Sequence, residues 1–401
     1  MVIEDTQHKI ISCFCYGGLI DMDIAELLFH ILRSEVDNTP VDPALRKDND
    51  PKELYRIAKK HDLLYCVFDA LYKADMLPED KTIFDTYTSA ALVETRRMLL
   101  IEDAFEKINK ALNEAEIPFV PLKGARIRSM YPNPMTRASC DIDILVKEEQ
   151  LEQAISALES LDFTTDRKRN YHDVSLYYGK IHLELHFNIC ENMDDIDALL
   201  KCVWEYVEPV SQYKYHEKPE FFIFHHIAHM KYHFMNGGCG IRPFLDLYVM
   251  RKKDFYDEEN LTKLLDQVSL KTFYQSILQV ISVWFEDAPH TELTKKCEEY
   301  ILHGGVYGSS DNSIAVNSAV HNGKLKNLLR LIFPNYEIMC VLYPNLMGHK
   351  YLLPLYYLKR MFAKSIGKNR EGTHKKVKDI LFFDKEKINT VNDLLQAMGV
   401  K

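Results

Sequence analysis

The chain has 401 residues, of which 47% are hydrophobic, and its formal net charge at pH 7 is −9. This composition excludes an intrinsically disordered chain. The acidic balance argues against a protein held on long nucleic acid or on an anionic membrane by bulk charge.

The sequence predicts neither a signal peptide nor a membrane span. Its start lacks a basic segment followed by a long apolar run, and no stretch of about 18 apolar residues occurs. The nine cysteines are an odd number and include no CxxC pair. We therefore expect reduced thiols, a cytoplasmic protein and no membrane partner.

Residues 1–115 are predicted to form an N-terminal helical region. Apolar residues recur every three or four positions along 23–35, 52–74 and 88–115, and the last segment is long enough for an extended helix. Residues 38–51 are rich in Pro, Asp and Asn and predict a loop between the first two helices.

Residues 116–195 show a different pattern and predict a small sheet. A short apolar run precedes Gly124, two helical turns follow, and CDIDILV at 140–146 alternates with period two. An amphipathic helix at 148–163 and two strands joined at Gly179-Lys180 complete a β-α-β-α-β-β unit, with a cationic loop at 166–172. The predicted fold class is α+β, with a small mixed sheet flanked by helical regions.

Residues 196–401 are predicted to form a C-terminal helical region. Apolar periodicity is clear around 219–235, 241–253, 269–285 and 353–366. Residues 303–324 are polar and rich in Gly, Ser and Asn, which predicts a loop.

Asp141 and Asp143 lie one residue apart within the predicted strand, so their side chains project to the same side. Two ionised carboxylates at that spacing repel each other, and a divalent cation removes the repulsion. The pair therefore predicts a metal site, although acids at an exposed strand start are an alternative.

Further polar residues accompany this pair. His182, Glu184 and His186 share one side of a later strand, which is either a neighbour of the first or an edge strand with a polar face. Lys123 and Gly124 lie at a predicted strand-to-helix turn, a place suited to anions. Together these features predict metal-dependent phosphoryl or nucleotidyl transfer.

Residues 117–188 resemble the nucleotidyltransferase superfamily, which includes DNA polymerase beta. The segments IPFVPLKGARIRSMYPNPMTRASCDIDILV and IHLELHF resemble more closely the uncharacterised nucleotidyltransferase family. The resemblance implies catalytic metal ligands at Asp141, Asp143 and Glu184 for Mg²⁺ or Mn²⁺. It also implies nucleotide-binding residues, which are Lys123, Gly124, Arg137 and His186.

The resemblance implies transfer of a nucleoside monophosphate from an NTP, which we expect to be ATP, to a hydroxyl or similar acceptor with release of pyrophosphate. The acceptor is a small molecule, a protein or an RNA end; long nucleic acid is the least expected. Ala125 departs from the superfamily, in which a Ser or Thr usually follows the glycine. A non-enzymatic nucleotide-binding or interaction module with a decayed site is therefore an alternative.

A second alternative is a metal-dependent phosphohydrolase. His225, His226, His229 and His233 lie at helical spacing that is compatible with a zinc site, although no HExxH glutamate is present. A structural role for these histidines is the simpler interpretation. Arg242 and Asp246, at i and i+4, are interpreted as an intrahelical ion pair.

Overall fold

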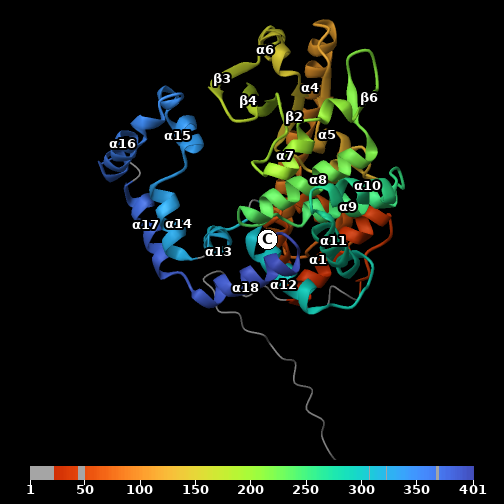
Figure 1. Ribbon diagram of the computed structural model, residues 1–401. Coiled ribbons are helices and arrows are strands. Elements are labelled where there is room, and N and C mark those ends of the chain that lie inside the picture. The colour runs from red at the N-terminus through yellow and green to blue at the C-terminus, as the bar shows by residue number, and fades with distance from the viewer. Residues whose placement is uncertain (1–21, 44–49, 307, 322, 367–369) are drawn as a thin grey trace, which may run out of the picture.

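The computed structural model describes residues 22–43, 50–306, 308–321, 323–366 and 370–401 (Figure 1). Its first helices are α1 (Met22–Asp37), α2 (Pro51–Lys60), α3 (Leu64–Lys73) and α4 (Lys81–Glu114). Helix α4 is 34 residues long, which confirms the predicted extended helix. It begins after Asp80, whose carboxylate accepts hydrogen bonds from the first backbone N–H groups of the helix.

The five-stranded mixed sheet confirms the predicted fold class. Its order is β1-β2-β5-β4-β3, and only β2 and β5 are parallel. The strands are β1 (Phe119–Pro121), β2 (Asp141–Val146), β3 (Thr164–Arg169), β4 (Asp173–Tyr178) and β5 (Ile181–His186).

Two details of the sheet differ from the prediction. Residues 164–169 form β3, so the cationic loop expected at 166–172 is largely a strand, because Thr164 and Thr165 pair with β4. Strand β5 lies between β2 and β4, so the interpretation of its polar residues as an edge-strand face is wrong.

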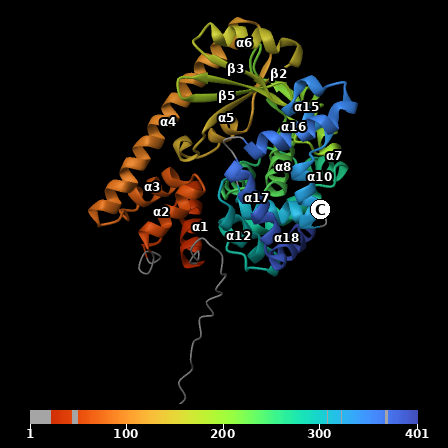
Figure 2. The same ribbon diagram turned by 90° about the vertical axis from the view of Figure 1, so that its left-hand side faces the viewer.

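The two faces of the sheet have different chemistry. Ile142 and Ile144 of β2 and Leu183 of β5 project into a hydrophobic core with α4 and with α6 (Leu151–Glu159). Figure 2 shows α4 running along this side of the sheet. The opposite face carries Asp141 and Asp143, and it turns towards the short helix α5 (Lys123–Arg128) and the C-terminal helices.

The C-terminal helices share one large hydrophobic core with α1, α2 and α3. A small helix and a hairpin lead into them, α7 (Asp194–Leu200), β6 (Val207–Pro209) and β7 (Tyr215–Glu217). The helices that follow are α8 (Pro219–Met235), α9 (Arg242–Lys252), α10 (Glu258–Gln267), α11 (Lys271–Phe285), α12 (Glu292–Gly304), α13 (Ser310–Val320) and, near the C-terminus, α18 (Lys385–Ala397).

Helix α13 occupies half of the stretch 303–324 that the sequence predicts to be a loop. Ser309 caps its first turn, because its hydroxyl accepts a hydrogen bond from the N–H of Asn312. The Asn312 amide in turn donates to the carbonyl of Tyr300, so polar residues stabilise a helix rather than a loop here.

Four helices form a lobe beside the main body, α14 (Lys324–Ile332), α15 (Tyr336–Leu342), α16 (Leu353–Ile366) and α17 (Arg370–Phe382) (Figure 1). Its separate hydrophobic cluster has few fully buried members, which are Met339, Cys340 and Leu346. Across the described residues, no helix of the protein combines the length and the apolar character needed to cross a membrane.

Candidate active site

The parallel pairing of β2 and β5 assembles the candidate site. Asp141 lies opposite His182, and Asp143 lies opposite Glu184. Because directly opposed residues of paired strands project to the same face, the acids of β2 and the polar residues of β5 form one patch. His186, two residues beyond Glu184, extends this patch.

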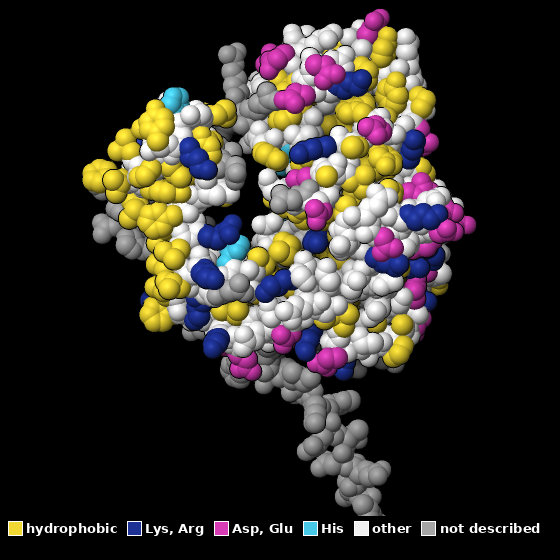
Figure 3. All heavy atoms as spheres, in the orientation of Figure 1, with side chains coloured by type: hydrophobic (Ala, Val, Ile, Leu, Met, Phe, Trp, Pro, Cys, Tyr) yellow, Lys and Arg dark blue, Asp and Glu magenta, His cyan; other side chains and the backbone are white. Residues whose placement is uncertain are grey.

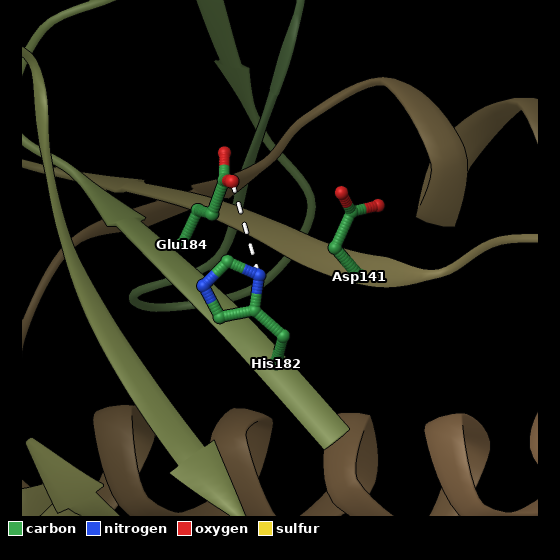
Figure 4. Close-up of side chains that lie close together, drawn as sticks. All are labelled: Asp141, His182 and Glu184. Atoms are coloured by element: carbon green, nitrogen blue, oxygen red, sulfur yellow. Dashed lines mark ion pairs between the residues drawn. The ribbon is translucent and has the colours of Figure 1, made fainter. Parts of the chain in front are cut away.

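Two groups of potential metal ligands form in this patch, among the residues described by the structure. One consists of Asp141, His182 and Glu184, and the other consists of Asp143, Glu184 and His186. The ligand atoms within each group lie within 4.8 Å of one another. Figure 4 shows the first group, with Asp141 on β2 and the other two side chains on β5.

The three predicted acids, Asp141, Asp143 and Glu184, therefore lie in one patch, but they are divided between two ligand groups instead of forming a single one. Glu184 belongs to both groups, whereas Asp141 and Asp143 belong to one each. His182 enters the site although the resemblance did not imply it; its position two residues before Glu184 was the available signal. The predominance of carboxylate oxygens, with one imidazole in each group, fits Mg²⁺ or Mn²⁺.

The electrostatics of the patch show why a cation fits there. Burial, together with the negative charges of Asp143 and Glu184, raises the pKa of Asp141 to about 6. Burial also opposes ionisation of Asp143, but a hydrogen bond from His186 and the charge of Lys123 outweigh it and hold the pKa of Asp143 below its ordinary value. His186 and Lys123 thus stabilise the ionised form of Asp143, whereas burial and the neighbouring acids disfavour the ionised form of Asp141.

His186 provides part of this stabilisation. Its Nε2 lies 3.1 Å from Asp143 Oδ1 and 3.5 Å from Glu184 Oε2. Burial alone would lower the pKa of His186, but these two carboxylates raise it to about 9. The imidazolium therefore carries positive charge between the two carboxylates of the second group, and His186 could itself ligate a metal ion only after losing this proton.

Lys123 and Gly124 are the first two residues of α5, which follows β1 after a single intervening residue. Lys123 adopts a φ of 33°, a left-handed conformation that is uncommon for a residue with a side chain. Its Nζ lies 3.1 Å from Nδ1 of His229 on α8. A Cβ at Gly124 would lie 2.9 Å from Ser139 Oγ and 3.0 Å from Arg137 Nη1, so glycine permits this close packing.

Arg137 is held by Asp246 of α9. The Nη2–Oδ2 distance is 2.8 Å and the Nε–Oδ1 distance is 3.2 Å, a bidentate ion pair between two buried side chains. The structure thus gives a protein partner to the guanidinium that the resemblance assigned to the triphosphate.

The interpretation of Arg242 and Asp246 as an intrahelical pair is wrong. Arg242 Nη1 instead lies 2.6 Å from Asp62 Oδ2, and Asp246 pairs with Arg137. Both ion pairs connect segments far apart in the sequence, which is why helical spacing did not reveal them.

A pocket of about 280 Å³ opens beside Asp141 and Asp143, between α4, α5 and β2. Gly124, Ala125 and Arg128 line it from α5. Its other lining residues come from α4 and from the segment leading into β2, and they are Ile101, Glu102, Phe105, Ser129, Pro134 and Ile142.

Arg128 is the functional candidate that the sequence analysis missed. Its side chain lines the pocket, the residue is only 9% exposed, and its buried Nε has no hydrogen-bond partner in the part of the chain that the structure describes. Burial, together with the nearby positive charge of Arg137, lowers the pKa of Arg128 to about 10. The carboxylate of Glu102, which also lines the pocket, raises this pKa but does not offset burial. An anionic ligand in this pocket would therefore stabilise the guanidinium further.

The histidines of α8 have separate partners. His225 Nδ1 lies 2.9 Å from Glu217 Oε1, and His226 Nε2 lies 2.9 Å from the carbonyl oxygen of Pro243. His229 lies between Lys123 and Glu191, and His233 Nε2 lies 3.0 Å from His229 Nε2. Within the described residues, these four histidines form no group of three metal ligands, so the geometry gives the zinc hypothesis no support.

Residues 47–286 match the family described as uncharacterised nucleotidyltransferase. No curated protein and no solved structure matches the chain. The matched range exceeds half of the chain, and it includes the metal-ligand groups, the Lys123-Gly124 turn and the pocket. The chain therefore belongs to the uncharacterised nucleotidyltransferase family.

Proposed function

We propose that this protein is a metal-dependent nucleotidyltransferase that moves a nucleoside monophosphate from an NTP to a hydroxyl or similar acceptor. One observation carries the proposal. Two carboxylate-containing ligand groups share Glu184, and they lie beside a pocket that contains the unpaired, buried Arg128. A site with cation ligands next to a buried positive charge suits a polyphosphate with its metal.

Asp141, Asp143 and Glu184 would hold Mg²⁺ or Mn²⁺, which supplies Lewis-acid stabilisation of charge on the phosphates when bound. Lys123 and Arg128 would neutralise the phosphate oxygens from the α5 side of the pocket. Gly124 would let the backbone approach them closely, and His186 would support Asp143 and Glu184 through the contacts described above.

In the proposed reaction, the acceptor oxygen attacks the α-phosphorus in line with the leaving group. The bond between the α-phosphorus and the α–β bridging oxygen breaks, and pyrophosphate leaves. Glu184, whose side chain is 31% exposed, would accept the acceptor's proton. The expected NTP is ATP, and the expected acceptor is a small molecule or a protein.

Calorimetric titration of each NTP, with and without Mg²⁺, tests this proposal. We expect Mg²⁺-dependent binding that is lost in Asp141→Asn/Asp143→Asn, because the carboxylate charges are removed while side-chain size is kept. Asp103→Asn is the matched control, since Asp103 lies exposed on α4 and pairs with Lys107. Wild-type protein that binds no NTP at millimolar concentration would contradict the proposal.

A specific observation favours one alternative, a nucleotide-binding module without turnover. Ala125 lines the pocket, so a methyl group faces the position where the superfamily usually has a hydroxyl. Ala125→Ser distinguishes the two. If the missing hydroxyl limits phosphate binding, the variant should bind NTP about two- to tenfold more tightly, the equivalent of one hydrogen bond. Pyrophosphate release by the wild type in the presence of an acceptor would exclude the module.

A further inference from the structure

The C-terminal lobe, defined as residues 324–382, has a charge opposite to that of the whole protein. It contains twelve Lys or Arg residues and three Asp or Glu residues, whereas the whole chain has 50 basic and 59 acidic residues. The net charge of −9 is therefore the sum of a strongly basic segment and a more acidic remainder of the chain. Arguments from the average charge do not apply to this lobe.

The lobe also exposes large apolar side chains in helical register. Leu325 and Leu329 on α14, and Phe333 directly after its end, are 68%, 46% and 44% exposed and lie four residues apart. Lys326 and Arg330 follow the same spacing and form an adjacent basic stripe, also exposed. This arrangement is an amphipathic helix whose apolar side is turned outward instead of into a core.

The neighbouring helices repeat the pattern. Ile338 and Leu342 are exposed one turn apart on α15, and Leu355, Leu358 and Phe362 are exposed along α16. Figure 3 shows hydrophobic side chains covering much of the outer side of the lobe, while most of the Lys and Arg visible in this view lie along the edge that faces the main body. An exposed apolar surface of this extent, over a core of few buried residues, indicates a surface that binds a partner.

The basic side chains are available to a partner. Lys326, Arg330, Lys350, Lys359 and Lys378 are exposed, and within the described residues none of them pairs with a carboxylate. Lys350 and Lys359 lie over tyrosine rings of the same lobe, which leaves their ammonium groups at the surface. The partner must therefore present negative charge together with an apolar phase.

We propose that the C-terminal lobe binds peripherally to the surface of an anionic lipid bilayer. Exposed Leu, Ile, Met and Phe side chains would enter the boundary between headgroups and acyl chains, and the lysines and arginines would contact anionic headgroups. A second copy of the lobe fits less well, because like charges would face each other. Single-stranded RNA fits less well too, since base stacking needs aromatic rings and the exposed apolar residues of this lobe are mostly aliphatic.

Co-sedimentation of the full chain with vesicles tests this proposal. We expect binding to vesicles of phosphatidylcholine containing about a third phosphatidylserine, and much weaker binding to phosphatidylcholine alone. Raising the salt from about 0.1 M to about 0.5 M should weaken binding, because it shortens the Debye length. The reversal Lys326→Glu/Arg330→Glu should weaken binding about tenfold or more.

Two further variants test the apolar contribution to vesicle binding and provide a control for the charge reversal. Leu325→Ser/Leu329→Ser removes apolar contact and keeps the charge, so it should also weaken vesicle binding. Lys263→Glu/Lys271→Glu reverses two exposed charges on α10 and α11, outside the lobe, and should leave binding unchanged. Circular dichroism of each variant checks that the fold is retained, which the exposure of these side chains leads us to expect.

Three outcomes would overturn the proposal. One is equal binding to neutral and anionic vesicles, or none to either. Another is that Lys326→Glu/Arg330→Glu and Lys263→Glu/Lys271→Glu weaken vesicle binding to the same extent. The last is a protein that does not bind vesicles but binds a fluorescent single-stranded RNA tightly. A protein that does not bind vesicles but forms a dimer in sedimentation velocity, which Leu325→Ser/Leu329→Ser abolishes, would have the same meaning.

Discussion

Arg137 and Asp246 form a buried bidentate ion pair that joins the segment before β2 to helix α9. Tyr131 adds a hydrogen bond of 2.7 Å from its hydroxyl to Asp246 Oδ1. Burial opposes ionisation of Asp246, but the charge of Arg137 and its hydrogen bonds hold the pKa of Asp246 below its ordinary value. The pair fixes the segment that leads into β2 against helix α9.

Removing one partner of this pair should destabilise the fold. Arg137→Ala leaves a buried, uncompensated carboxylate, so we expect the free energy of unfolding to fall by about 3–5 kcal/mol. Urea denaturation measures the change. Arg137→Met/Asp246→Leu, which removes both charges, should recover much of the loss. Unchanged stability of Arg137→Ala with loss of NTP binding would instead support the phosphate-binding role that the resemblance implies.

Arg128 should contribute to ligand binding at the expense of stability. Its buried guanidinium forms no ion pair with the described residues, and the nearby Glu102 does not offset its burial, so Arg128→Gln should leave the melting temperature equal or higher. The same variant should bind NTP about tenfold or more weakly, because a charge-assisted hydrogen bond is lost. Calorimetry measures the NTP affinity, and thermal unfolding measures the melting temperature. Lys110→Gln, an exposed change on α4, is the control; a large drop in melting temperature in Arg128→Gln would show that the residue has a structural role.

Gly124 should be intolerant of even one added methyl group. A Cβ there would approach Ser139 Oγ to 2.9 Å and Arg137 Nη1 to 3.0 Å, and both atoms are buried. Gly124→Ala should therefore cost about 1–3 kcal/mol of unfolding free energy. Gly124→Ala/Ser139→Gly removes the nearer contact and should recover part of the loss in the same denaturation assay. No recovery would mean that the strain lies elsewhere.

Glu298 gives the protein a specific pH dependence of stability. Burial raises its pKa from an ordinary 4.5 to about 7, although Trp284 Nε1 donates a hydrogen bond of 2.7 Å to its carboxylate. The folded state therefore binds this proton more tightly than the unfolded state does. The stability that it contributes is fully present below about pH 4.5 and is lost as pH rises through about 7.

Glu298→Gln keeps an acceptor for Trp284 and removes the titration. Between pH 5 and pH 8, the wild type should lose on the order of 2 kcal/mol more unfolding free energy than the variant does. The exposed neighbour Glu299→Gln is the matched control and should behave as the wild type. Parallel stability curves for wild type and Glu298→Gln would contradict the assigned pKa.

Local patterns were sufficient to locate the acids of the site. The period-two alternation of residues 140–146 puts Asp141 and Asp143 on one side of a strand, and the same argument groups His182, Glu184 and His186 on another. Both inferences hold, because the direction of side chains along a strand depends on backbone geometry alone.

The partners of the charged residues could not be obtained in this way. Helical spacing suggested that Arg242 pairs with Asp246, but each pairs with a residue more than a hundred positions away. Arg128, one of several arginines in its region, becomes distinctive only because the fold buries it beside a pocket and leaves its Nε without a hydrogen-bond partner among the described residues.

By itself, the sequence determined the α+β class, the long helix before the sheet and the carboxylates that define the family resemblance. These features depend on periodicity and spacing within short segments. Only the tertiary structure decided that β5 lies beside β2, that Glu184 is shared between two ligand groups and that Arg137 is neutralised by Asp246. These relationships depend on contacts between distant segments, and the free energy of such contacts is set by burial and geometry that no local pattern encodes.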